Sequence, residues 1–155
     1  MRIHGVDLAR GAAAGAAGTT ALHAATYLDM AWRGRPASAT PERTVDRLVG
    51  RAVPGDGQRR ANRLTGLGAL GSILAGLAAG AALGGLRGLG WRPGAAGTAA
   101  SAAGIAMLVG NVPMTVLGIS DPRGWSVADW ASDLLPHAAY GLAAGATLSA
   151  LDPPR

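Results

Sequence analysis

Five polar side chains stand out in an otherwise apolar chain, because their types and spacing suit proton handling or metal binding. They are His23, Tyr27, Asn111, Asp133 and His137. His23 and Tyr27 are four residues apart, as are Asp133 and His137, so each pair shares one helix face. Counted from the nearer polar boundary, both histidines lie about 14–15 Å into their segments. We therefore expect these groups at similar depth, on faces that pack against other helices.

Three interpretations of this polar cluster remain open. In the first, which we prefer, the side chains hydrogen-bond across helices and fix their register. In the second, they carry a proton or an ion, since ionisable groups inside a membrane are often functional. Burial would favour neutral histidines, whereas Asp133, one turn from His137, would oppose that effect. In the third, His23, Asp133 and His137 hold a metal ion, although no compact histidine pair supports such a site.

The sequence lacks the motifs of common enzyme classes. It contains no GxSxG, no HExxH and no phosphate-binding loop, and its glycine-rich runs lie within apolar segments rather than after strands. The absence of cysteine excludes disulfides, thiolate metal sites and cysteine nucleophiles. We therefore expect no enzymatic activity, and neither a cofactor nor a metal.

Four apolar segments must position these polar groups. Leu64–Leu86 is a run of 23 residues without a charge. As a helix it would reach about 34 Å, which exceeds a hydrocarbon core of roughly 30 Å. The first segment is the weakest, since it contains His23 and Asp29. Membrane spans are expected over approximately 9–32, 64–86, 95–119 and 128–151.

The segment 33–63, between the first and second spans, is polar and is expected to be a cytoplasmic loop. Thr40 is the expected N-cap of a short helix, Pro41 its first residue and Glu42 an acid in its first turn. The arginines of this helix lie mostly away from its apolar face, which indicates an amphipathic helix on the membrane surface. The apolar face comprises Val45, Leu48, Val49 and Ala52. The predicted fold class is all-α: one domain over residues 1–155, with four transmembrane helices and this surface helix.

The distribution of arginine predicts the orientation in the membrane. All 14 basic residues are arginine, and the net charge is +5. Eight lie in the segment 33–63, and Arg123 falls on the same side. The opposite side carries Arg2, Arg10, Arg87, Arg92 and Arg155. The positive-inside rule therefore favours both termini outside, and because the arginines flank apolar spans, nucleic acid is not an expected partner.

Small residues recur at every fourth position of three segments. They allow helix backbones to approach closely in lipid, where hydrophobic burial gives little driving force. An alternative explanation is a general bias of the chain toward glycine and alanine. We expect helix packing at Gly76, Gly80, Gly84, Gly141 and Gly145 in particular. The full rows are Gly68, Ser72, Gly76, Gly80, Gly84 and Gly88; Gly141, Gly145 and Ser149; and Gly11, Gly15 and Thr19.

Several sequence stretches together suggest a family. They are a Gly/Ala-rich first span, the junction Tyr27–Pro36, the Thr40-Pro41-Glu42 motif and the segment Asp129–Gly141. In the order of these elements, most of the chain resembles small uncharacterised four-span membrane proteins of actinobacteria, which are distantly similar in layout to YagU-like inner-membrane proteins. The resemblance implies the fold and the membrane location and supplies no activity.

These features lead to a multi-pass protein of the cell membrane, with a structural or accessory role as the first hypothesis. One alternative is a small proton-coupled transporter that works as a dimer. A further alternative is a metal-binding membrane module. The expected partners are the lipid bilayer and either a second copy of the chain or another membrane protein.

Overall fold

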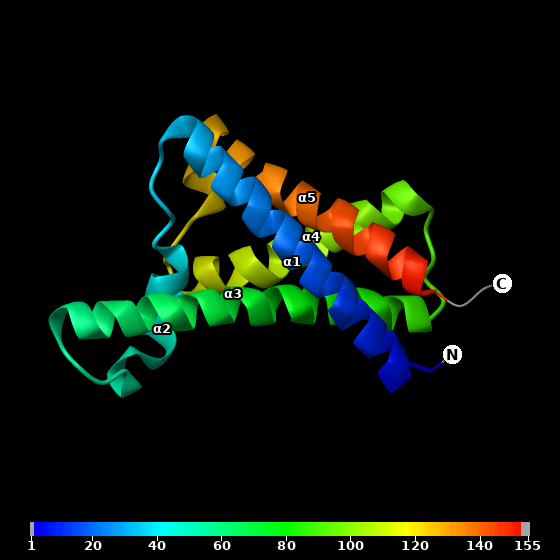
Figure 1. Ribbon diagram of the computed structural model, residues 1–155, viewed down its shortest axis with the longest axis horizontal. Coiled ribbons are helices and arrows are strands. Elements are labelled where there is room, and N and C mark those ends of the chain that lie inside the picture. Colours follow the sequence, from blue (N-terminus) through cyan, green and yellow to red (C-terminus); the bar gives the residue numbers. More distant parts are fainter. Residues whose placement is uncertain (1, 153–155) are drawn as a thin grey trace.

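The computed structural model describes residues 2–152, and Arg155 of the orientation count therefore lies outside the described residues. Over residues 2–152 the chain forms helices and connecting segments and no strand, which confirms the all-α prediction (Figure 1). The elements are α1 (Gly5–Arg33), α2 (Thr40–Val49), the 3-10 turn η1 (Gly50–Ala52), α3 (Gly57–Gly88), α4 (Ala95–Val116), the 3-10 turn η2 (Pro122–Gly124) and α5 (Val127–Leu151).

The long helices correspond to the four predicted ranges, with three main differences at their ends. Helix α1 begins at Gly5 rather than at residue 9. Helix α3 begins at Gly57 rather than at Leu64, because the polar residues before the apolar run continue the same helix. Helix α4 ends at Val116 rather than at residue 119. Gly118 has a φ of 66°, the left-handed conformation that commonly terminates helices.

The start of α2 also differs from the prediction. The helix begins at Thr40, and Ala39 occupies the cap position without a side-chain hydrogen bond. The expected capping by Thr40 is therefore wrong by one residue. The Thr40 hydroxyl is instead hydrogen-bonded to the hydroxyl of Ser38, which precedes the helix.

The four long helices form a ring in the order α1, α3, α4 and α5, and each helix is antiparallel to its two neighbours (Figure 1). Helix α2 packs on the N-terminal part of α3. There, a Cβ atom added to Gly68 would lie 3.1 Å from the backbone of both Pro41 and Glu42. The amphipathic helix predicted for the membrane surface is thus attached to the side of the bundle.

Helices α1 and α3 contact each other through their backbones. A Cβ atom added to Gly15 would lie 2.5 Å from the carbonyl oxygen of Gly76, and one added to Gly80 would lie 2.5 Å from the Cα of Gly15. Gly11 and Gly84 show the same relation, with 2.8 Å between an added Cβ on either residue and the other's Cα. Real Cβ atoms do not approach other atoms this closely. The contact therefore requires glycine on both helices.

Helices α4 and α5 also meet through small residues. A Cβ atom added to Gly141 would lie 2.9 Å from the Cβ of Ala103, and one added to Gly145 would lie 3.3 Å from the Cα of Ala99. All five glycines expected to pack helices thus lie at interhelical contacts, with Gly76, Gly80 and Gly84 against α1 and the other two against α4.

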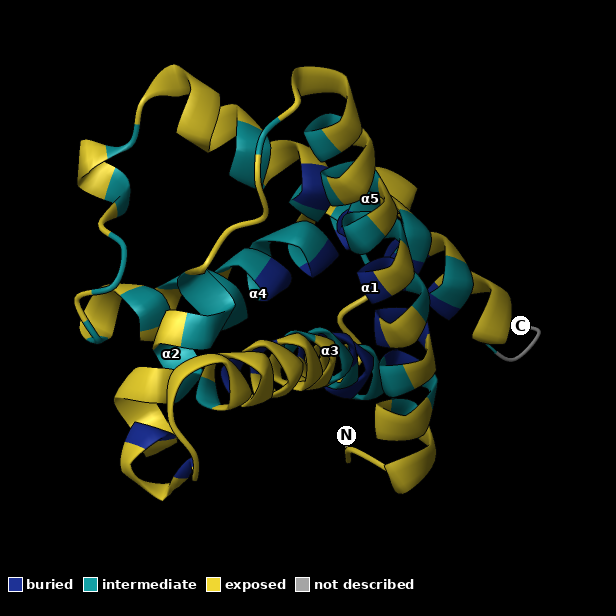
Figure 2. Ribbon diagram, turned by 60° about the vertical axis from the view of Figure 1, so that its left-hand side comes forward, coloured by how far each residue is buried: buried dark blue, intermediate teal, exposed yellow. Residues whose placement is uncertain are grey.

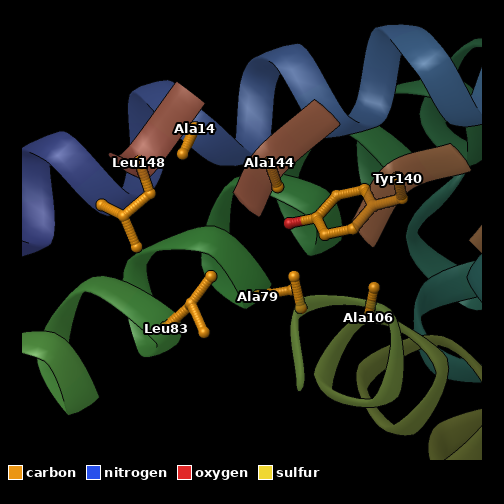
Figure 3. Packing of buried hydrophobic residues seen from close by; sticks show 8 residues of the cluster. Ala14, Ala79, Leu83, Ala106, Tyr140, Ala144 and Leu148 are labelled. Atoms are coloured by element: carbon orange, nitrogen blue, oxygen red, sulfur yellow. The ribbon is translucent and has the colours of Figure 1, made fainter. Parts of the chain in front are cut away.

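The core contains one large aromatic residue surrounded mainly by alanine and leucine (Figure 3). Tyr140 of α5 is 1% exposed, and its hydroxyl donates a 2.7 Å hydrogen bond to the carbonyl oxygen of Gly76 on α3. Its ring covers Gly18 of α1, where an added Cβ would lie 2.7 Å from the ring. Tyr140 thereby connects three helices. The buried cluster comprises Ala14, Ala79, Leu83, Ala102, Ala106, Tyr140, Ala144 and Leu148.

Most large apolar side chains lie on the outside of the bundle, as the exposed outer surface of α3 illustrates (Figure 2). Leu74 on α3 is 65% exposed, and Leu142 on α5 is 67% exposed. Helices α3 and α4 are long and apolar enough to cross a membrane, and only 28% and 6% of their most apolar stretches are buried. Two of the four predicted spans thus qualify by length and hydropathy.

The contact between α1 and α3 predicts opposite effects for two glycine-to-alanine substitutions on α3. Gly80→Ala places a methyl group against the α1 backbone and should lower the free energy of unfolding by about 1–3 kcal/mol. Gly71, the control, has no heavy atom within 4 Å of an added Cβ. Gly71→Ala should leave stability unchanged or raise it by up to about 1 kcal/mol through helix propensity. Unfolding in mixed detergent micelles, followed by circular dichroism, measures both; equal effects would contradict the backbone contact.

Candidate functional site

Three of the five predicted polar residues lie together between α4 and α5, and we call them the polar triad: Asn111, Asp133 and His137. The Asn111 side-chain amide donates a 2.9 Å hydrogen bond to Oδ2 of Asp133. Nδ1 of His137 lies 3.4 Å from Oδ1 of Asp133. The Asp133 and His137 side chains are 17% and 14% exposed, so both are largely buried but still partly accessible from the surface.

The hydrogen-bond geometry indicates which ring nitrogen of His137 carries a hydrogen. Its Nδ1 lies 2.7 Å from the backbone carbonyl oxygen of Asp133, one turn earlier in the helix. A carbonyl oxygen can only accept, so Nδ1 carries the hydrogen and Nε2 is left for another partner. Every member of the triad therefore has a hydrogen-bond partner within the chain.

The other two predicted residues, His23 and Tyr27, lie on α1 and interact with each other. Their rings stack with 5.9 Å between centroids and 30° between planes. Tyr27 is 61% exposed. No hydrogen bond or ion pair in the described part of the chain joins either residue to the polar triad. The structure thus divides the predicted cluster into two groups.

The division follows from the two faces of α5. The row that contains Asp133, His137 and Gly141 faces α4. Ser132 and Tyr140, on another face, contact α1. Residues four apart share a helix face, so Asp133 and His137 lie on a different face of α5 from the residues that contact α1. Among residues 2–152, no three His, Asp or Glu side chains lie close enough together to hold a metal ion. The interpretation of His23, Asp133 and His137 as one metal site is therefore wrong.

Charged residues at the C-terminal end of α1 form a second polar cluster. Asp29 accepts 2.6 Å hydrogen bonds from both Arg33 and Arg35. Arg33 also donates to the Ser132 hydroxyl of α5. The hydrogen bond with Asp29 raises the pKa of Arg33 above its ordinary value. The acid that weakened the first predicted span is thus neutralised at the end of the helix.

A third polar cluster, which the sequence analysis missed, lies at the opposite end of the bundle. Arg87 of α3 donates to Asp152, to Thr98 of α4 and to Ser149 of α5, over distances of 3.1 to 3.2 Å. Arg92 donates to the same Asp152 carboxylate. The sequence could have predicted this ion pair, because Arg87 directly follows the charge-free run and Asp152 directly follows the last predicted span. Both positions fall at the same end of a four-helix bundle. The cluster joins α3, α4 and α5.

Glu42, predicted only as an acid in the first turn of α2, lies where α2 packs on α3. Its Oε2 is buried and has no hydrogen-bond partner among residues 2–152. The N-terminal end of a helix favours negative charge, which offsets part of the cost of this position. Glu42 therefore belongs to the packing of α2 on the bundle, apart from the polar triad.

Comparisons with protein-family models, with curated proteins and with solved structures found no match to this chain. The chemistry open to the chain follows from its own residues. The polar triad offers a carboxylate, an amide and an imidazole between two helices, which suits either an interhelical hydrogen-bonded connection or proton exchange.

A double-mutant cycle tests the division of the predicted cluster. Asn111→Ala and Asp133→Ala should show a coupling free energy of about 0.5–2 kcal/mol, because their side chains share a hydrogen bond. His23→Ala combined with Asp133→Ala is the control, and its effects should add within about 0.5 kcal/mol. Both cycles are measured by unfolding in mixed micelles. Strong coupling of His23 with Asp133 would show that the five residues act as one group.

Proposed function

We propose that the protein is a multi-pass membrane protein in which α1, α3, α4 and α5 all cross the bilayer, with a structural or accessory role. One observation carries this proposal: small residues make up most of the interior, with few large side chains among them, while most large apolar side chains lie on the outside. In water such an arrangement would expose far more apolar surface than a soluble domain of this size tolerates. In lipid it is favourable, because small residues allow close helix packing and large apolar ones contact acyl chains.

The inclusion of α1 and α5 is supported by their lengths and by the placement of their charges. They contain 29 and 25 residues, and about 20 suffice to cross a hydrocarbon core. Asp29 is paired with two arginines at the end of α1. Asp129 accepts hydrogen bonds from Ser126 in the first turn of α5. These charged residues lie at helix ends, where a membrane protein meets headgroups and water, whereas Asp133 lies further inside α5 and is hydrogen-bonded to Asn111.

The arginines support the predicted orientation, and the tryptophans support the proposed membrane interfaces. Nine arginines lie at the end of the bundle that contains α2, and four of the described ones lie at the other end. Trp32, Trp125 and Trp130 lie at the arginine-rich end, and Trp91 lies at the opposite one. Tryptophan favours membrane interfaces, and an excess of arginine marks the cytoplasmic side. The arginine excess therefore favours a cytoplasmic location for α2, and the tryptophans at both ends are in keeping with two membrane interfaces.

The polar triad fits a structural role, because each member has a partner within the chain. Hydrogen bonds of this kind fix the register of neighbouring helices in lipid. The protein would then act by holding a defined helix arrangement in the membrane, on its own, as a homo-oligomer or beside another membrane protein.

Five single-cysteine variants test the four spans, since the chain has no cysteine of its own. They are labelled in intact and permeabilised cells with a membrane-impermeant maleimide. We expect the label to reach Gly5→Cys, Gly94→Cys and Ala150→Cys from outside, and Gln58→Cys and Gly124→Cys only after permeabilisation. Sites that are consecutive in the chain flank one proposed span, so two consecutive sites on the same side would remove that span.

A proton-coupled transporter that works as a dimer is the second candidate, favoured by the contact between Asp133 and His137 in a partly accessible position. Under the structural proposal, proteoliposomes with the wild-type protein should show the same decay of an imposed pH gradient as protein-free liposomes. A gradient-dependent proton flux in the wild type that is lost in both Asp133→Asn and His137→Ala would replace the structural role by transport.

A further inference from the structure

Two neighbouring grooves lie beside α2 at the arginine-rich end of the bundle. The first, which we call the apolar groove, lies between η1 and the start of α3, has a volume of about 740 Å³ and contains Val53, Leu67 and Leu70. The second, which we call the basic groove, lies between α2 and the end of α4 and has a volume of about 920 Å³. Val49 and Ala52 line both grooves. An apolar and a basic compartment therefore share one wall.

The basic groove carries three arginines whose charges are not neutralised within it. Arg43, Arg47 and Arg51 line this groove and form no ion pair within residues 2–152. The one acid of the groove, Asp46, is already paired with Arg60. These arginines follow one another at intervals of four residues. Their like charges repel one another, and a phosphate between them would form charge-assisted hydrogen bonds. The groove therefore favours an anionic ligand.

The apolar groove carries a single cation at its polar end. Nη1 of Arg63 donates a 2.6 Å hydrogen bond to the carbonyl oxygen of Pro54, which fixes the side chain at the groove wall. From Arg63 to Leu70 the helix advances about 10 Å. Leu70 is 57% exposed and Leu74 continues the same surface, so the groove opens onto the outer apolar face of α3. A hydrocarbon chain can therefore enter it from that face.

We propose that the two grooves together bind one anionic phospholipid, with its phosphate in the basic groove and an acyl chain in the apolar groove. The proposal rests on the membrane location proposed above. Basic pockets on the cytoplasmic side of membrane proteins favour anionic headgroups. A soluble anion would satisfy the arginines but would leave Leu67 and Leu70 uncovered. A neutral lipid would cover the leucines and leave the arginines unneutralised.

The test is native mass spectrometry of the detergent-solubilised full chain, titrated with phosphatidylglycerol or phosphatidylcholine. The wild type should bind one phosphatidylglycerol about tenfold more tightly than phosphatidylcholine. Arg47→Gln/Arg51→Gln should lose most of this preference. The matched control, Arg59→Gln/Arg123→Gln, removes the same charge at the same end of the bundle from residues outside both grooves, and it should keep the preference. Circular dichroism verifies that both variants are folded.

Competition distinguishes the phospholipid from other anions. Glycerol phosphate and polyglutamate, added to the wild type, should not displace phosphatidylglycerol at equal concentration. Displacement by glycerol phosphate would make the ligand a soluble phosphate, and displacement by polyglutamate would make it an acidic polypeptide; either result overturns the lipid proposal. Equal affinity for both lipids also overturns it. A chain that passes the cysteine-labelling test but shows equal affinities loses only the lipid site, whereas failure of the labelling test removes the membrane proposal itself.

Discussion

The backbone contact between α1 and α3 determines where the remaining helices can lie. Gly11, Gly15, Gly80 and Gly84 bring the two helix axes so close that no side chain fits between them. This approach leaves the carbonyl oxygen of Gly76 accessible to Tyr140, which reaches it from α5 across Gly18. Because α5 is held there on one face, its other face is presented to α4. The rest of the ring follows from this single close approach.

The polar residues are arranged so that none of the main clusters lies on the lipid-facing surface proposed for the bundle. Charges occur at the two ends, where Arg33 and Arg87 each join α5 to another part of the bundle. Between these ends, the polar triad contributes the Asn111–Asp133 hydrogen bond between α4 and α5. A polar group inside a bilayer is costly unless it has a partner. These hydrogen bonds therefore specify which helices pair and in which register, which contacts between glycine and alanine alone would define only weakly.

Much of the fold could be predicted from the sequence, because apolar runs and four-residue rows depend only on local periodicity. The glycine rows indicated which faces meet, but not which helix each face meets. The pairing of Asp133 with Asn111 rather than with His23 depends on the rotation of α5 between two neighbours, a property of the assembled ring. The same limit hid Tyr140, whose role arises only when three helices converge. The early start of α3 was missed because its first turn is polar and carries no hydrophobic signal.

The ring order has a consequence for biosynthesis. Helix α1 is synthesised before α3, α4 and α5, yet its two neighbours in the ring are α3 and α5. Until α5 has been synthesised, Gly18 of α1 is not covered by the ring of Tyr140. The ring therefore closes only after translation has passed Tyr140, and its closure brings α1 against a helix that is synthesised after both α3 and α4.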